Sequence, residues 1–175
     1  MNLTTLDALL IFLVGHKGQS GYDIRQLFQA TPLGMFSDSP GSIYPSLARL
    51  EARGLLASSA VADGRRQRSY RRTPSGRKAM LAWLNAPVEL DERRPAEVEL
   101  RFVMIAEAIG WPHAVQFLEA AEAAYAVRLK ELEAFAAGPG AAMDRASRAA
   151  FDLGLRSCRV RMAWCRDTRT KKGRT

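Results

Sequence analysis

Hydroxyl and guanidinium side chains gather in one stretch of the chain, between Ser39 and Tyr70. Serine, tyrosine and arginine are side chains with which proteins contact the phosphate oxygens and base edges of DNA. Arginines on a projecting loop suit phosphates or a minor groove. The stretch therefore carries side chains that suit a polyanion, and they come from two segments: Ser39, Ser42, Tyr44, Ser46 and Arg49 in the first, and Arg65, Arg66 and Arg68 in the second.

The first segment is expected to form a short helix that begins near Ser42 and ends before Gly54. Pro45 then falls in the first turn, where a missing N–H costs little, and Gly54 provides a left-handed stop. Apolar residues at i, i+4 and i+7 predict the buried face of this helix: Ile43, Leu47 and Leu50. We expect its opposite face to expose Ser42, Tyr44, Ser46 and Arg49.

The second segment is expected to form a β-hairpin. Two short runs, Leu55–Val61 and Gln67–Arg72, flank Asp63-Gly64, which is a strong hairpin signal. The three arginines of this segment then lie at or near the hairpin tip. A helix followed by an arginine-tipped hairpin predicts a winged helix-turn-helix, whereas the same arginines taken alone fit a solvated surface turn equally well.

The amino-acid sequence of this stretch resembles that of the PadR family of bacterial transcriptional regulators. The resemblance is carried by Gly41-Ser42-Ile43-Tyr44-Pro45, Leu47, Arg49-Leu50-Glu51, Gly54-Leu55-Leu56, Tyr70, Thr73 and Gly76. It implies that the helix and hairpin bind operator DNA. Ser20-Gly21-Tyr22-Asp23 also matches the family's usual opening of the preceding helix, in which Tyr22 either presents its hydroxyl to a phosphate or packs its ring.

The chain departs from the family at one point before the next helix. The family usually has an apolar residue two positions after the tyrosine, and this chain has Tyr70-Arg71-Arg72-Thr73. Period two places Arg72 on the strand face of Tyr70. Either the strand twists outward at its end, or the Arg72 stem snorkels past Tyr70.

Composition permits a folded, basic protein with a polyanionic partner. The chain has 175 residues, 47% of them hydrophobic, a net charge of +8 and a pI near 10.1. No run approaches the roughly 18 apolar residues of a membrane span, and the apolar run at the N-terminus lacks the features of a signal peptide. We therefore expect a cytoplasmic protein without membrane contact.

The chain is expected to be mainly α and to divide into two domains. Thr4-x-x-Asp7 and Ser20-x-x-Asp23 resemble capping boxes at the starts of two helices. Residues 1–86 are predicted to form the winged helix-turn-helix, with a two-stranded β-wing. A short charged segment follows, and residues 95–170 then contain helical patterns only, which predicts an all-helical dimerisation domain.

The last helix carries two apolar stripes. The first, with 4-3-4-3 spacing, is Phe151, Leu155, Cys158, Met162 and Cys165, and the second is Ala146, Ala150, Leu153, Val160 and Trp164. Two stripes imply burial on two sides, one against the chain's own helices and one against a second copy. We assign the first stripe, together with Trp164, to homodimerisation. The two cysteines are too far apart along a helix for a disulfide and are expected to be reduced and buried.

Little in the chain indicates catalysis or a cofactor. The only histidines, His16 and His113, lie in different predicted elements without metal-ligand spacing, and no glycine-rich phosphate loop occurs. Some relatives within the resembling family bind planar aromatic compounds and release DNA, which implies a small aromatic effector here. We therefore predict a homodimeric DNA-binding transcriptional regulator, a repressor acting on a palindromic operator. The alternatives are a winged-helix module for protein–protein contact and a protein that sequesters a small molecule.

Overall fold

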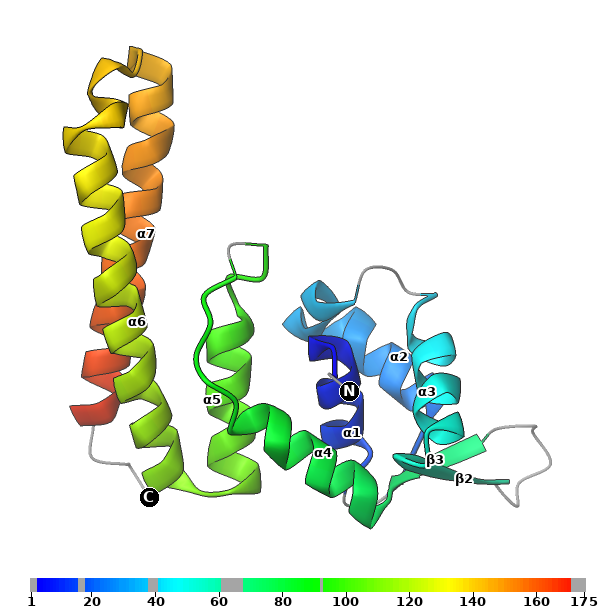
Figure 1. The fold of residues 1–175 in the computed structure, drawn as a ribbon. Helices are drawn as coiled ribbons and strands as arrows, with labels where there is room; N and C mark the ends of the chain where they lie inside the picture. The colour runs from blue at the N-terminus through cyan, green and yellow to red at the C-terminus, as the bar shows by residue number, and fades with distance from the viewer. Residues whose placement is uncertain (1–2, 16–17, 38–40, 61–67, 92, 171–175) are drawn as a thin grey trace. The chain divides into compact units, whose positions relative to one another are not determined.

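The computed structural model describes residues 3–15, 18–37, 41–60, 68–91 and 93–170. The chain divides into two compact units, Met1–Ala86 and Pro87–Thr175, which are described separately. Within the described residues, the fold is mainly helical, with one small antiparallel sheet in the first unit (Figure 1). The fold class predicted from the sequence is confirmed.

Five helical segments form the first unit together with the sheet: α1 Thr5–Leu13, α2 Gly21–Ala30, the 3₁₀ helix η1 Pro32–Phe36, α3 Ile43–Ala52 and α4 Pro74–Leu84. Both predicted capping boxes are confirmed at the starts of α1 and α2. In each box the Ser or Thr hydroxyl accepts the N–H of the third helical residue, and that residue's carboxylate accepts the N–H of the cap. These bonds satisfy backbone groups that a helix start leaves unpaired.

The sheet has three strands in the order β1-β3-β2, all antiparallel: β1 Gln19–Ser20, β2 Leu56–Ala60 and β3 Arg68–Arg72. The pairing of β2 with β3 confirms the predicted hairpin, with Ser58 opposite Tyr70. The Asp63-Gly64 turn lies outside the described residues. The two-residue strand β1 was not predicted, because two residues are too few to show the alternation of apolar and polar side chains that indicates a strand.

The turn between α3 and β2 is fixed by two glycines. Gly54 has a φ of 69° and ends α3 as predicted, while the next N–H, that of Leu55, bonds back to the Leu50 carbonyl. Gly76, in the first turn of α4, lies against the same turn. A Cβ at Gly76 would stand 2.0 Å from the Leu55 carbonyl oxygen, so only glycine fits there. Because this contact joins α4 to the start of β2, it sets where the hairpin leaves the helices.

The Arg72 side chain turns inward, so neither an outward twist of the strand nor a guanidinium that snorkels past Tyr70 to solvent describes it. Its side chain is half-buried, and its Nη1 donates to the Met80 sulfur at 3.4 Å. The guanidinium lies over Gly15, where an added Cβ would stand 2.8 Å from the Arg72 Cζ. Burial, and secondarily the charge of Arg77, lowers the pKa of Arg72. The absence of a side chain at Gly15 therefore makes room for an arginine at the end of β3.

The second unit consists of α5 Glu97–Ala108, α6 Trp111–Ala137, the 3₁₀ helix η2 Pro139–Ala142 and α7 Arg145–Thr170. Figure 1 shows α6 and α7 side by side along their length, joined by the turn at η2. Ion pairs run between the two helices, and their order shows an antiparallel pair: Glu119 with Arg169, Glu122 with Arg166 and Arg169, and Glu133 with Arg159.

The structure corrects the assignment of the two stripes on α7. Cys158 and Cys165 are buried within the chain, and the Cys158 thiol donates to the Tyr125 carbonyl of α6 at 3.3 Å. Phe151 stacks on Phe135 of α6, with ring centroids 5.6 Å apart. The first stripe, which also contains the half-buried residues Leu155 and Met162, therefore packs α7 against α6. It was assigned to a partner because spacing alone does not show which stripe faces inward.

The second stripe of α7 is the exposed one. Leu153 and Val160 are each 67% exposed, and Trp164, half-buried, meets Phe102 of α5 edge-on at 5.6 Å. Leu153, Val160 and Trp164 line one shallow groove together with Glu99, Arg156, Ser157 and Arg161. We call these three apolar residues the outer stripe.

Candidate nucleic-acid interface

The exposed face of α3 carries two large side chains that can contact a ligand. Tyr44 is 43% exposed, and the Arg49 side chain is 49% exposed. The predicted inward residues Ile43, Leu47 and Leu50 are buried. Between Tyr44 and Arg49 the face offers only the small residues Pro45, Ala48 and Ala52, all exposed. The helix can therefore approach a surface closely, with one polar group at either side.

Ser46 was predicted to lie on this exposed face, but its side chain is buried and the residue is only 4% exposed. It occupies the i+3 position from Ile43 and so completes the buried i, i+3, i+4, i+7 stripe of α3. Its hydroxyl accepts a hydrogen bond from Arg49 Nη2 at 3.2 Å. Ser46 is thus a support for Arg49 and is not placed to contact DNA.

Arg49 joins α3 to α1 through Asp7. Its Nη2 stands 2.6 Å from Asp7 Oδ1, and the Asp7 side chain is only 3% exposed. The sequence had shown Asp7 only as a capping residue, because no local pattern links positions 42 apart. The ion pair holds α3 against α1.

The other end of α3 is joined to the hairpin through Glu51. Ser58 of β2 donates to Glu51 Oε1 at 2.5 Å, and Arg68 of β3 pairs with Glu51 Oε2 at 3.4 Å. Arg68 itself remains 66% exposed. The helix and the start of the hairpin are therefore positioned together. The predicted site residues Ser39, Arg65 and Arg66 lie outside the described residues.

The two tyrosines of the predicted site come from neighbouring helix starts. A Cβ on Gly21 would stand 2.7 Å from Tyr44 Cε1, so the Tyr44 ring lies directly on the first residue of α2. The next residue, Tyr22, is 48% exposed, and its hydroxyl accepts a hydrogen bond from the Gln26 amide at 2.7 Å. Ser42, ahead of α3, lies with its hydroxyl oxygen 2.7 Å from that of Ser37. These hydroxyl groups gather where α2 and α3 begin.

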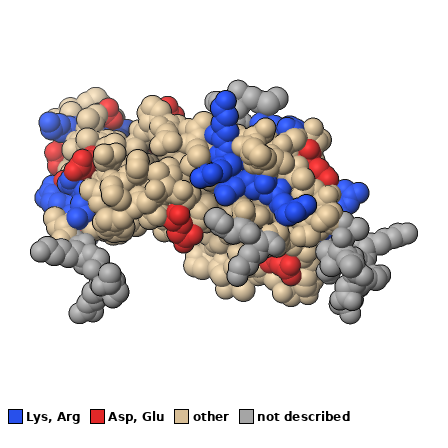
Figure 2. Space-filling model, turned by 90° about the horizontal axis from the view of Figure 1, so that it is seen from below, with Lys and Arg blue, Asp and Glu red and all other residues tan. Residues whose placement is uncertain are grey.

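Lysine and arginine also gather on the underside of the molecule, as Figure 2 shows in the right half of the view. The exposed basic residues of β3 and α4 are Arg68, Arg71, Arg77 and Lys78. The sequence already showed this concentration of charge. Of these four residues, Arg68 pairs with α3 through Glu51.

Comparison with known proteins identifies the region that contains this surface. Residues 9–82 match the Transcriptional regulator PadR-like family. The matched segment runs from α1 through α4 and so includes α3, the hairpin and every described residue of the predicted DNA site. Residues 9–82, less than half of the chain, are therefore similar to PadR-like transcriptional regulators. This family consists of regulators rather than enzymes.

A curated transcriptional regulator is similar to this chain over a shorter stretch. The transcriptional regulator Rv3488 of Mycobacterium tuberculosis is 60% identical to this chain over 43 residues. That alignment covers 24% of this chain and 40% of the relative, so the chain spans less than half of the protein it matches.

Solved structures similar to this chain are also PadR-like. Bacillus subtilis PadR in complex with operator DNA is 20% identical, with a TM-score of 0.44, over 94% of this chain and 96% of that one. The PadR-like regulator BC1756 from Bacillus cereus is 20% identical, with a TM-score of 0.43, over 94% and 95%. At these TM-scores the likenesses carry no weight for what this chain binds.

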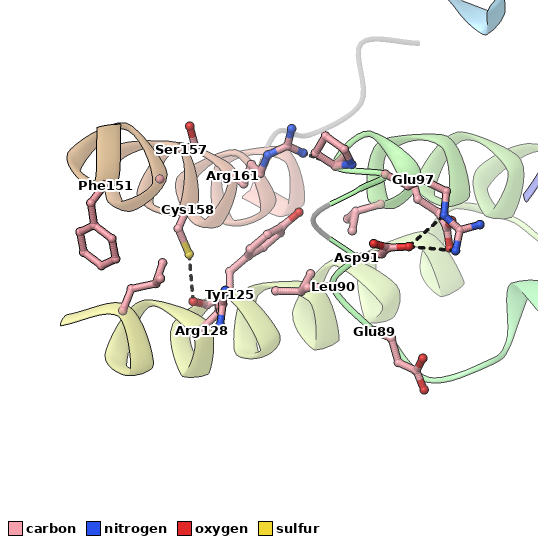
Figure 3. A pocket seen from close by; sticks show the side chains of 15 residues that line it. Glu89, Leu90, Asp91, Glu97, Tyr125, Arg128, Phe151, Ser157, Cys158 and Arg161 are labelled. Atoms are coloured by element: carbon pink, nitrogen blue, oxygen red, sulfur yellow. Dashed lines mark hydrogen bonds and ion pairs between the residues drawn. The ribbon is translucent and has the colours of Figure 1, made fainter. Parts of the chain in front are cut away.

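The helical unit that follows the PadR-like region contains a cavity of about 500 Å³. Figure 3 shows the Tyr125 and Phe151 side chains pointing into it from α6 and α7. Apolar side chains line much of the wall, and the charged ones are balanced in sign: Glu89, Asp91, Glu97, Arg94, Arg128 and Arg161. The hydrogen bond from the Arg93 backbone N–H, and after it the pairing with Arg94, lowers the pKa of the Asp91 carboxyl.

In the part of the chain that the structure describes, no group of three or more His, Cys, Asp or Glu side chains is placed to hold a metal ion. Among the same residues, no helix is both long and apolar enough to cross a bilayer.

Proposed function

We propose that this chain is a sequence-specific DNA-binding transcriptional regulator, a repressor that acts as a homodimer on a palindromic operator. The observation that carries the proposal is the exposed face of α3, which presents Tyr44 and Arg49. Ion pairs and hydrogen bonds tie this helix to α1 at Asp7 and to the hairpin through Glu51. A helix held in this way can enter a major groove while its position relative to the hairpin stays fixed.

The proposed contacts divide by chemistry. Arg49 lies on the groove-facing side of α3 and is suited to a base edge, while Tyr44 and Tyr22 offer hydroxyls for phosphates or bridging waters. Ser42, at the start of α3, belongs to the same group of hydroxyls. Arg68, at the start of β3, is suited to a phosphate, and the sequence extends this role to Arg65 and Arg66. Ser39 is retained only as a sequence-based candidate.

A second copy of the chain is the proposed partner of the outer stripe. Leu153 and Val160 are exposed on the side of α7 that does not face α6, and they share a groove with Trp164. Apolar side chains repeated along one helix face are buried economically by the same face of a second copy. Dimerisation would place two α3 helices on two half-sites, about one DNA turn or a multiple of it apart.

The cavity in the helical unit is the proposed site for a small aromatic effector. Its volume falls in the range of small-molecule pockets, and Tyr125 and Phe151 provide aromatic surface. The first stripe of α7 contributes to its wall through Cys158. A ligand there would act if it bound better to a dimer geometry that no longer fits the operator. Titration of a planar aromatic library, followed by tyrosine and tryptophan fluorescence, tests this: no saturable binding would remove the effector.

Two other functions would use the same features differently. A winged-helix module for protein–protein contact would use the exposed arginines on an acidic partner. A sequestering protein would bind a small molecule in the cavity tightly without operator affinity. Both alternatives predict that no duplex is preferred over any other.

The test of the proposed function is fluorescence anisotropy with duplexes tiled across the DNA upstream of the gene. A scrambled duplex and two salt concentrations separate specific from electrostatic binding. We expect one duplex to bind with a Kd of roughly 10⁻⁸ M or tighter, in the range of specific regulators. Equal, weak binding to all duplexes would contradict the proposal.

A further inference from the structure

Asp7 takes part in two arrangements at once. As the third residue of α1 it closes the capping box: its Oδ2 accepts the Thr4 N–H at 3.2 Å, and its own N–H donates to the Thr4 hydroxyl at 3.1 Å. Its other oxygen, Oδ1, accepts Arg49 Nη2 at 2.6 Å. The cap fixes the carboxylate on the backbone of α1, so the carboxylate is a rigid support for the guanidinium.

The geometry of Arg49 leaves one side of its guanidinium available. A single nitrogen, Nη2, makes both recorded contacts, to Asp7 and to the Ser46 hydroxyl at 3.2 Å. Within the described part of the chain, Nη1 and Nε of Arg49 have no hydrogen-bond partner, and the side chain is 49% exposed. Arg49 can thus donate to a ligand while its other side stays fixed to α1.

Two consequences follow for contact with DNA. A guanidinium whose orientation is already fixed loses little conformational entropy when it meets a base edge, so directional hydrogen bonds to a base are favoured. The carboxylate of Asp7 also compensates the charge of Arg49 within the protein. A compensated arginine contributes less to binding any phosphate, which is the sequence-independent part of affinity.

We propose that Asp7 is a positioning residue for DNA recognition: it aims Arg49 at a base edge and suppresses the binding of Arg49 to phosphates at random. This inference rests on the proposed function. It assigns to Asp7 a contribution to sequence discrimination, in addition to its contribution to the cap of α1.

Asp23 provides a matched control for Asp7. It is the third residue of α2 and closes the second capping box, with bonds of 3.2 and 3.1 Å to Ser20 that repeat those of Asp7 to Thr4. No arginine pairs with Asp23 among the described residues. Asp7→Asn and Asp23→Asn therefore both weaken a cap and remove one negative charge, but only Asp7→Asn releases Arg49.

The test measures the affinity of the full-length variants for the preferred duplex and for a scrambled duplex, by anisotropy across a salt series, below the unfolding temperature of each variant. For Asp7→Asn we expect the ratio of the two affinities to fall about tenfold, the size of one base contact. We also expect its salt slope on the scrambled duplex to steepen by up to about one ion. Asp23→Asn is expected to change neither quantity relative to wild type.

A double mutant separates positioning from a general effect on the fold. In an Arg49→Gln background, Asp7→Asn is expected to leave the affinity ratio unchanged, because no guanidinium remains to be aimed. An equal loss of ratio from Asp7→Asn with and without Arg49, equal effects of Asp7→Asn and Asp23→Asn, or an unchanged ratio in Asp7→Asn would each overturn the inference. Wild-type protein that prefers no duplex would instead overturn the proposed function, and the inference with it.

Discussion

Single residues in this chain are constrained by what they touch rather than by their type. Gly76 and Gly154 illustrate the difference, since both lie within helices. A Cβ at Gly76 would collide with the Leu55 carbonyl, whereas a Cβ at Gly154 would meet no atom within 4 Å. The fold requires glycine at position 76. At position 154 glycine only destabilises the helix, because its backbone loses more conformational entropy on folding than that of alanine.

Opposite effects on stability are therefore expected from the same substitution at the two positions. Gly76→Ala should destabilise the protein by about 1–3 kcal/mol, because the backbone of the α3–β2 turn must shift. Gly154→Ala should stabilise it by about 0.5–1 kcal/mol. Chemical denaturation of both variants measures the free energy of unfolding. A stable Gly76→Ala protein would contradict the close approach of α4 to the turn.

The cysteines of α7 are expected to be unreactive in the native protein. Burial raises the pKa of Cys158 and raises that of Cys165 to about 11, and the thiolate is the reactive form. A maleimide at pH 8 should label both thiols far more slowly in native than in denatured protein. Because unfolding lowers the pKa of Cys165 toward 9.0, stability should be retained below pH 9 and fall between pH 9 and 11. Rapid native labelling would contradict the inward position of the first stripe.

At the scale of elements, α7 packs one face on its own chain and exposes the outer stripe, for which we propose a second copy as the partner. Val160 lies on the outer stripe at 67% exposure, and Val127, on α6, is exposed to a similar extent at 59%. We expect Val160→Glu to shift the protein toward monomer in light scattering, because a carboxylate in an apolar helix seam must be desolvated. Val127→Glu is the matched control and should remain dimeric. A monomeric wild-type protein would contradict the proposed role of the outer stripe.

Much of the element order could be predicted from the sequence. The apolar spacing of Ile43, Leu47 and Leu50, the two capping boxes and the stop at Gly54 depend on neighbours within one helix turn or two, and the structure confirms them. The burial of Ser46 was missed because a serine does not indicate which way it faces. For the two stripes of α7, the spacing alone does not show which one faces α6.

Contacts between distant segments could not be predicted. The pairing of Arg49 with Asp7, the inward turn of Arg72 over Gly15 and the strand at Gln19 all join positions far apart in the chain. The local sequence around each of these residues does not indicate which distant residue it contacts. The candidate site could therefore be placed on α3 and the hairpin, whereas the supports that hold Arg49 and Arg68 appeared only in the structure.

For the whole molecule, operator binding depends on both units in the proposed function. In the proposed function, the helical unit pairs two chains, and the PadR-like unit of each chain reads one half-site. Binding to an operator should then depend on both half-sites, since one α3 helix offers few base contacts alone. An exposed face with only two large polar side chains, Tyr44 and Arg49, makes this dependence strong.

The most direct test is the anisotropy titration of the native protein with the preferred duplex, the same duplex with one half-site scrambled, and a fully scrambled duplex. The account predicts tight binding to the first, a loss of at least about a hundredfold on the second, and salt-sensitive, weak binding to the third. Equal affinity for all three duplexes would contradict the claim that this chain reads DNA sequence as a dimer.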